Sequence, residues 1–492
     1  MYSIINLRRK GVAMIEDYLY KFKNMYRVSP SWFKNSVGQA YSRLPMIIRY
    51  GNIYKEYKEF LEKSQRWSYK QLKEWQLYQL NKLLKHVYKN VPYYRNVFNE
   101  RGLKPDDIQD LSDLKKLPYL TRDLVRENSE DLIAKNIPHS KGLYFTTGGS
   151  TGTPLGFYWE KGRTRSLERA FMWRQWSWVG YKPERRDRTV VLRGLLTNNL
   201  LGDYDPIDNS LILSSYNLKE NNLQKYILRI REFKPISVQA YPSVITILAN
   251  YILQNKISPI NSLKVILCGS ENLFPQQRKI IEKAFQCRVF SWYGQGESVC
   301  LAGNCEEGSN NYHIFSEYGI TEIINDKDNI IPEGQEGTGE IVATGFNNYF
   351  MPFIRYKTGD IGVRTKEKCN CGRNYPLLSR IEGREQEYIL TKDDKIVSLT
   401  GLIFGLHFSA FEKIKQMQLI QEEKGLIIIN VVKYNNYSSR DEEEIRTKMN
   451  KAVCGTLDIK FKYVDEIERT VRGKHKFLIQ KLPIKFGLNI MH

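Results

Sequence analysis

Residues 144–154 have side chains that suit the binding of phosphate groups. The segment YFTTGGSTGTP begins like a strand and continues as a run of glycine, serine and threonine. Glycine lets the backbone approach a ligand closely, successive N–H groups can form an anion-binding nest, and hydroxyl groups add donors for phosphate oxygen atoms. No Gly-Lys-Ser/Thr follows, so the segment is not a Walker A loop. The pattern predicts phosphate binding, against the alternative of a flexible Ser/Gly turn.

Three cysteines and one histidine form a second candidate site. Cys369 and Cys371 make a tight Cys-x-Cys turn, while Cys305 and His313 flank the turn-prone residues 306–309. Three thiolates and an imidazole can close a tetrahedral structural zinc site. The spacing does not match a common zinc finger, so free loop cysteines and a core histidine stay as alternatives. A catalytic Cys–His pair has less support, because no third orienting group is evident.

Five further motifs follow the Gly/Ser/Thr segment. They are CGSE (268–271), WYGQGE (292–297), RYKTGD (355–360), RIEGR (380–384) and RTVRGK (469–474). Together with TTGGSTGTP, these motifs resemble, in the same order, those of the adenylate-forming superfamily, particularly its phenylacetate–CoA ligase and capsule-biosynthesis CapK branch. The segments VPYYR and LPYLT in the helical lead-in also look like this branch, so the resemblance covers about residues 50–485.

The resemblance implies an enzyme that places a carboxylate oxygen on the α-phosphorus of ATP, releases pyrophosphate and passes the acyl group to an acceptor. Its implied cofactors are ATP and Mg²⁺. The first five motifs supply the residues implied to bind them, which are Thr146, Thr147, Gly148, Gly149, Ser150, Thr151, Gly152, Ser270, Glu271, Tyr293, Gly294, Glu297, Asp360 and Arg384.

The implied catalytic residues are Thr147, Glu297 and Lys474. Thr147 and the other hydroxyl groups of its segment would hold the β- and γ-phosphates. Glu297 would bind Mg²⁺, which favours one or two carboxylates together with phosphate oxygen atoms. Lys474 would bridge the attacking carboxylate and the α-phosphate as a mobile point charge.

The remaining implied roles concern the nucleoside and the hinge. Tyr293 would lie beside adenine, Asp360 would accept hydrogen bonds from both ribose hydroxyls, and Arg384 would contact the ribose. After Gly-Arg, phenylacetate–CoA ligases usually have Asp-Asp and then Gly-x-Asn, whereas this chain has residues 385–387 (EQE) and a turn at 393–394. The sequence therefore leaves the use of CoA uncertain.

The acid and the acceptor are not determined by the motifs. The CapK resemblance implies capsule or other surface-polysaccharide assembly, with a small or medium-sized acid. Alternatives are an acyl-CoA ligase, an enzyme that transfers AMP itself, and a non-catalytic protein that docks on a polysaccharide synthesis complex. Some phenylacetate–CoA ligase relatives also carry a Cys/His metal cluster at matching places, which agrees with the zinc prediction.

These motifs require an α/β scaffold. Residues 69–88 have the apolar spacing of an amphipathic helix, and buried strands near 189–192, 236–239 and 265–268 alternate with helices at 223–233 and 243–254. The last hundred residues show a β-β-α-β pattern. We therefore expect an α/β protein with a large multi-layer N-terminal domain of adenylate-forming type (residues 1–383, helical lead-in to about 120) and a small mobile α+β C-terminal domain (384–492).

Composition restricts the function class. The 492 residues contain 75 Lys+Arg against 54 Asp+Glu, a net charge of +21. The basic residues are dispersed and no nucleic-acid motif is present, so nucleic acid is not an expected partner. Seven scattered cysteines do not form a disulfide framework, and neither a signal peptide nor an apolar span is evident. We expect a cytoplasmic protein, with peripheral membrane association and oligomeric state left undetermined.

Overall fold

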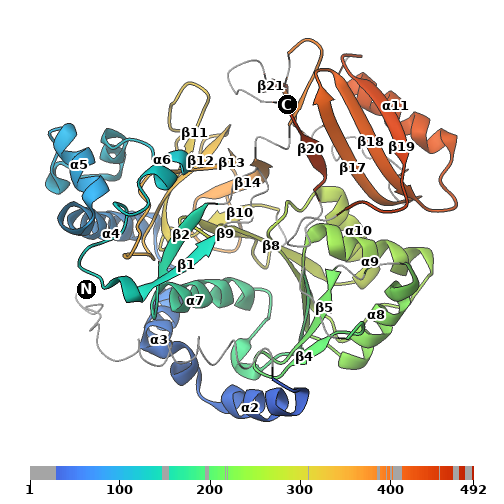
Figure 1. Cartoon of the computed structure of the whole chain (residues 1–492), viewed down its shortest axis with the longest axis horizontal. Coiled ribbons are helices and arrows are strands. Elements are labelled where there is room, and N and C mark those ends of the chain that lie inside the picture. The colour runs from blue at the N-terminus through green and yellow to red at the C-terminus, as the bar shows by residue number, and fades with distance from the viewer. Residues whose placement is uncertain are drawn as a thin grey trace.

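The computed structural model has a large N-terminal part and a smaller C-terminal part (Figure 1). In Figure 1 the smaller part lies next to α9 and α10 of the larger one, on the side away from the N-terminal helices. The structure describes residues 29–146, 155–193, 199–215, 218, 220–307, 310–384, 388–394, 396–398, 402, 410, 413–453, 455–468, 476–482 and 490–491.

A mixed sheet of twelve strands forms the centre of the large part, in the order β11-β12-β13-β14-β10-β9-β8-β7-β6-β3-β5-β4. The run from β5 to β8 is parallel, and the other pairs are antiparallel. The strands are β3 (Thr189–Arg193), β4 (Asp203–Asp205), β5 (Ser210–Ser214), β6 (Ser237–Ala240), β7 (Val265–Cys268), β8 (Arg288–Gly294), β9 (Leu301–Gly303), β10 (Tyr312–Ile314), β11 (Gly319–Ile324), β12 (Gly337–Gly345), β13 (Tyr356–Arg364) and β14 (Leu377–Arg384).

Helices cover both faces of the parallel strands. Along β7, Ile266 and Cys268 pack under α8, α9 and α10, whereas Val265 and Leu267 pack toward α3 and α7. This alternation follows from the two-residue period of a strand, and it confirms the predicted α/β class. The helices are α3 (Met46–Ser64), α7 (Thr164–Ser177), α8 (Glu220–Phe233), α9 (Pro242–Gln254) and α10 (Pro275–Phe285).

The N-terminal helices cover the antiparallel strands. Ser68 caps α4 (Tyr69–Asn90) by accepting a hydrogen bond from the Gln71 N–H, and the apolar stripe predicted from the sequence is the buried face of this helix. Leu120 forms a bridge with Tyr356, which attaches the lead-in to β13. The other helices are α2 (Ser31–Arg43), α5 (Pro92–Glu100), α6 (Arg122–Glu127), η1 (Pro105–Asp107), η2 (Leu111–Lys116), η3 (His139–Lys141) and η4 (Pro183–Arg185).

Two small sheets are separate from the twelve-stranded sheet. The hairpin of β1 (Gly142–Thr146) and β2 (Gly156–Glu160) carries the Gly/Ser/Thr segment between its strands. In the C-terminal part, β15 (Tyr388–Leu390) and β16 (Ile396–Ser398) form a second hairpin, at the turn predicted from the sequence, and β21 (Ile490–Met491) pairs with β16.

The C-terminal core has the predicted β-β-α-β order. Its elements are β17 (Ile414–Glu423), β18 (Leu426–Lys433), α11 (Ser439–Ala452), β19 (Asp458–Tyr463) and β20 (Leu478–Gln480), with the strands in the order β19-β18-β17-β20. Phe274, at the start of α10, packs into this core, with its ring centroid 6.2 Å from that of Phe477. Of the helices that the structure describes, none combines the length and the apolar character needed to cross a membrane.

Candidate functional site

The structure describes some of the predicted ATP-binding residues and leaves others out. Ser270, Glu271, Tyr293, Gly294, Glu297 and Asp360 are described, whereas Thr146 and Arg384 are described only in their backbone. Outside the described residues lie Thr147, Gly148, Gly149, Ser150, Thr151, Gly152 and Lys474.

The β1–β2 hairpin joins the Gly/Ser/Thr segment to the motif that contains Glu297. Thr146 pairs with Gly156, so the two ends of the segment lie at the end of the hairpin ladder. The indole N–H of Trp159 in β2 donates a hydrogen bond to the carbonyl of Gly296 at 2.8 Å. A Cβ at Gly296 would lie 3.1 Å from the Phe157 ring, so this close packing favours glycine. Sequence reasoning did not identify this contact.

Glu297 is a buried acid just beyond the carboxyl end of β8. The residue is 6% exposed, and its Oε1 accepts a hydrogen bond from the Tyr356 hydroxyl at 3.2 Å. Ser298 has a φ of 56°, and its N–H bonds to the Gln295 carbonyl at 3.2 Å. A tight turn therefore holds the carboxylate next to β13, which contributes Tyr356.

The side chains of Asp360 on β13 and Tyr293 on β8 contact each other. The Tyr293 hydroxyl donates to Asp360 Oδ2 at 2.8 Å, and the Gln295 side-chain amide also lies against this hydroxyl. Burial, followed by the nearby Asp360 carboxylate, raises the pKa of Tyr293 well above its ordinary value, so the phenol stays a donor. Gly359 has a φ of 74° and donates its N–H to Glu340 Oε1 at 3.2 Å, which fixes the turn before Asp360.

The CGSE motif lies at the carboxyl end of β7, beside these residues. A Cβ at Gly269 would lie 2.5 Å from the Trp292 ring, so only glycine fits there. Ser270 has a φ of 66°. Glu271 Oε2 accepts a hydrogen bond from the Ser243 N–H at 3.1 Å, in the first turn of α9, where a negative charge is favourable. Sequence reasoning placed Glu271 at the nucleotide and missed this contact.

Arg355 directly precedes β13 and bonds to β11 and to the N-terminal lead-in. No role was assigned to it from the sequence. Its guanidinium donates to Glu322 Oε2 and Oε1 at 3.0 and 2.9 Å and to the Leu117 carbonyl at 2.7 Å. The Arg355 and Glu322 side chains are 5% and 7% exposed. The Tyr119 ring centroid lies 4.3 Å from the guanidinium carbon. An arginine within the apolar run MPFIRY was the only available signal in the sequence.

Cys305 and His313 come together with Cys369 and Cys371, although the two pairs are far apart in the sequence. Their four ligand atoms lie within 4.8 Å of one another. Cys305 Sγ is 3.4 Å from Cys369 Sγ, and Cys371 Sγ is 3.3 Å from His313 Nε2. Tetrahedral zinc with Zn–S bonds of about 2.3 Å holds its sulfur ligands roughly 3.8 Å apart, so this spacing suits one ion.

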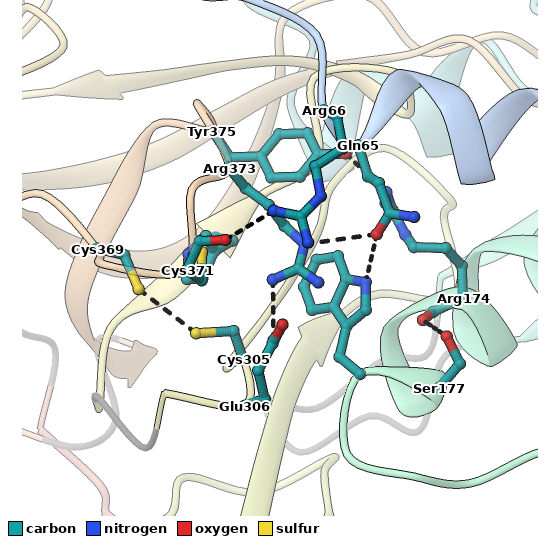
Figure 2. Close-up of polar contacts among 12 residues, drawn as sticks. Gln65, Arg66, Arg174, Ser177, Cys305, Glu306, Cys369, Cys371, Arg373 and Tyr375 are labelled. Carbon is teal, nitrogen blue, oxygen red and sulfur yellow. Dashed lines mark hydrogen bonds and ion pairs between the residues drawn. The ribbon is translucent and has the colours of Figure 1, made fainter.

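Hydrogen bonds connect the cluster to neighbouring elements (Figure 2). Arg66, just after α3, donates to the Cys371 carbonyl at 2.9 Å. Arg373 donates to Glu306 Oε2 at 2.8 Å, and its guanidinium carbon lies 3.8 Å from the centroid of the Trp178 ring. The cluster thus links the loops that contain its cysteines to residues beside α3 and α7.

Two proteins are similar to this chain in sequence, and a family model matches its C-terminal part. Residues 389–481 match the model of the CapK C-terminal domain. Protein CapK of Staphylococcus aureus is 26% identical over 467 residues, which cover 93% of this chain and 99% of CapK. Phenylacetate-coenzyme A ligase of Escherichia coli is 27% identical over 65% of this chain and 73% of its own length.

Solved structures share the fold. 2-Hydroxyisobutyryl-CoA ligase in the postadenylation state gives a TM-score of 0.70 at 18% identity, over 85% of this chain and 92% of that one. The same ligase in the thioesterification state gives 0.57 at 19% identity, over 85% and 91%. The arrangement of this chain is thus closer to the first of these two structures. The chain belongs to the adenylate-forming ligase superfamily, in the branch that contains the phenylacetate–CoA ligases and CapK.

Proposed function

We propose that this ligase uses ATP to convert a carboxylic acid into an acyl-AMP with release of pyrophosphate, and then transfers the acyl group to an acceptor. One observation carries the proposal, namely that three distant motifs converge. Tyr293 on β8 binds Asp360 on β13, Tyr356 on β13 binds Glu297, and the β1–β2 hairpin bonds to the carbonyl of Gly296.

The described side chains fit ATP and Mg²⁺. The Tyr293 hydroxyl orients the Asp360 carboxylate, which suits acceptance of hydrogen bonds from two ribose hydroxyls. Glu297 offers a buried carboxylate beside a neutral hydroxyl, and this suits a hard cation that also binds phosphate oxygen atoms. Mg²⁺ would neutralise phosphate charge there.

Further residues, several of them outside the described parts, complete the proposed site. Thr146, Thr147, Ser150, Thr151 and the neighbouring glycines would hold the β- and γ-phosphates, because hydroxyl and backbone N–H donors match these oxygen atoms. Lys474 would lie between the acid and the α-phosphate. Ser270 and Gly294 would line the adenine and acyl pocket, and Arg384 would contact the ribose.

We place the domain boundary between residues 383 and 384, with the small domain turning there between the two half-reactions. Two hydrogen bonds support a role for β17 in presenting Lys474. Gln416 Oε1 accepts from the Ile467 N–H at 3.2 Å, and Gln418 Nε2 donates to the Lys476 carbonyl at 3.0 Å. Both ends of the segment that contains Lys474 are thereby attached to one strand.

The Cys/His cluster is proposed as a structural zinc site. The donor set of three sulfur atoms and one imidazole nitrogen fits zinc. The ion would hold the loop at 369–371 against β10 and the segment after β9. Four protein ligands close a tetrahedral site and leave no position for water or substrate, which favours a structural role over a catalytic one.

The CapK relationship favours an acceptor in capsular or other surface-polysaccharide synthesis. The CapK relative spans 93% of the chain, whereas the phenylacetate–CoA ligases of Thermus thermophilus and Escherichia coli span 64% and 65%. Transfer to CoA is the second candidate, because these shorter matches carry that activity in their names.

ATP–pyrophosphate exchange against a panel of carboxylic acids tests the proposal. We expect exchange with at least one acid. In Lys474→Ala the exchange rate should fall by more than about 100-fold, because the variant removes a positive charge that would stabilise the transition state. Lys481→Ala, whose exposed partner is Glu422 at 2.5 Å, is the matched control and should retain full exchange. A folded, ATP-binding protein that shows no exchange with any acid would exclude acyl-AMP formation and favour AMP transfer or docking.

A further inference from the structure

Phe274 belongs to the large part of the chain, but its side chain packs into the core of the small C-terminal part. Among the described buried residues of that core, it is the only one from the large part. Its ring centroid lies 6.2 Å from that of Phe477, within the usual range for an aromatic pair. The Phe274 N–H donates to Gln277 Oε1 at 3.2 Å, and its carbonyl accepts from the Arg278 N–H at 3.0 Å. The first turn of α10 therefore fixes the position of this residue.

Phe477 connects this contact to the segment that contains Lys474. The Phe477 carbonyl accepts a hydrogen bond from the Leu419 N–H at 2.7 Å, and the neighbouring Lys476 carbonyl accepts from Gln418 Nε2 at 3.0 Å, so both residues are attached to β17. Lys474 precedes Phe477 by three residues, a length of chain that spans at most about 11 Å. On the other side, Phe274 follows the CGSE motif by three residues. The contact between the two rings thus limits the distance between the lysine segment and the carboxyl end of β7.

The surroundings of the ring pair are polar and incompletely packed. α9 lies against β17 (Figure 1), and a cavity of about 80 Å³ remains between α9, α10 and β17. The polar side chains that line it include Ser243, Thr246, Gln276, Gln277, Lys415 and Gln416. Polar interfaces within a chain allow domains to move relative to one another, and buried aromatic side chains supply much of the binding energy of an interface. Loss of the Phe274 ring should therefore weaken the attachment of the small part more than loss of one polar side chain.

We propose that Phe274 and Phe477 form an anchor that holds the small domain in the arrangement for acyl-AMP formation, which makes Phe274 a positioning residue for Lys474. Phe274 belongs to none of the six sequence motifs and acts through Phe477 alone. Turning of the small domain would break this contact, and one ring pair within a polar interface can separate and form again. This inference rests on the proposed function, because it takes Lys474 as the residue that acts on the acid and the α-phosphate.

The ATP–pyrophosphate exchange assay tests the anchor through kcat and KM. In Phe274→Ala we expect kcat to fall by about 10- to 100-fold, because displacement of a reacting group by about 1 Å can cost that much. KM for ATP and for the acid should change by less than about 3-fold, since the variant alters an interaction needed only in the transition state. Phe274→Leu keeps an apolar side chain and should recover most of the loss. Phe477→Ala should resemble Phe274→Ala, and the double variant should be no worse than either single one, because both remove the same contact.

Hydrogen–deuterium exchange gives a second readout that needs no substrate. In Phe274→Ala, the amides of residues 414–423 and 476–482 should exchange about 10-fold faster, while those of β6 and β7 stay unchanged, because only the attachment of the small part is weakened. Leu228→Ala is the matched control, since Leu228 is 49% exposed on α8, and it should behave as the wild type in both measurements.

Three results would overturn the inference: an unchanged kcat in Phe274→Ala, losses that add in the double variant, or amide exchange that is either unchanged or faster throughout the central sheet. If no acid supports pyrophosphate exchange, the proposed function fails, and the amide measurement alone decides whether the anchor exists. Faster amide exchange confined to residues 414–423 and 476–482 then supports the anchor, and any other pattern refutes it.

Discussion

Removal of Glu322 should destabilise the large part of the protein because it leaves the Arg355 guanidinium buried without its carboxylate. Breaking a buried ion pair by deleting one partner costs about 3–5 kcal/mol. Arg355 would keep its bond to the Leu117 carbonyl and its contact with the Tyr119 ring, worth about 1 kcal/mol each. We therefore expect Glu322→Ala to lower the free energy of unfolding by about 3 kcal/mol, the lower end of that range.

The same reasoning predicts recovery in a double variant. Burial raises the pKa of Glu322 although Arg355 opposes this, so the intact pair carries a large desolvation cost. Removing both charges in Glu322→Ala/Arg355→Met should thus be less harmful than Glu322→Ala alone, by about 1 kcal/mol or more. Arg355 directly precedes β13, which contains Tyr356 and Asp360. Loss of its ion pair should displace these two residues, so we also expect weaker ATP binding in Glu322→Ala.

Urea unfolding followed by tryptophan fluorescence measures these differences. The control is Glu336→Ala, since Glu336 and Lys366 form an exposed pair at 3.9 Å with side chains 62% and 72% exposed. Loss of this exposed pair in Glu336→Ala should change the free energy of unfolding by less than about 0.5 kcal/mol. A change of this small size for Glu322→Ala, or a double variant less stable than the single one, would refute the reasoning.

Two other predictions concern a buried acid and the metal cluster. Burial raises the pKa of Glu168 to about 7, against hydrogen bonds from Tyr318, Ser298 and Asn347 that lower it. Because this folded-state pKa exceeds the unfolded value, the wild type loses stability as pH rises from about 4.5 to 7, by up to about 1.4 kcal/mol per pH unit, and the loss then levels off. The advantage of Glu168→Gln in unfolding free energy should grow over this interval, and a constant difference would contradict the assignment. Purified protein should contain one zinc ion by elemental analysis, and Cys371→Ser should lose it and melt at a lower temperature.

Controls separate these effects from general damage. Cys287→Ser changes a cysteine outside the cluster and should retain the metal. Wild-type protein without stoichiometric zinc, yet with an unchanged melting temperature after chelation, would rule out the structural zinc site.

The sequence predicted the local structure and the family correctly. The apolar stripe of α4, the short buried runs that became β3, β6 and β7, and the β-β-α-β order of the last hundred residues are each encoded within a few consecutive turns or strand residues. Motif order gave the family for the same reason, because each motif is a short local signal. The roles of Thr147, Asp360, Arg384 and Lys474, the domain boundary at 383/384 and the zinc ion stay predictions.

Only the tertiary structure decided which side chains share a space. The order of strands in a sheet is set by how all the elements pack, and no local pattern records it. That packing puts the Tyr293 hydroxyl against Asp360 and the Trp159 indole against the Gly296 carbonyl. The pair of Arg355 and Glu322 likewise joins residues 33 positions apart, and it forms because a buried charge that water cannot solvate is stabilised by a partner of opposite sign. Spacing along the chain fixes the chemistry that each motif can perform, and long-range packing fixes where those groups meet.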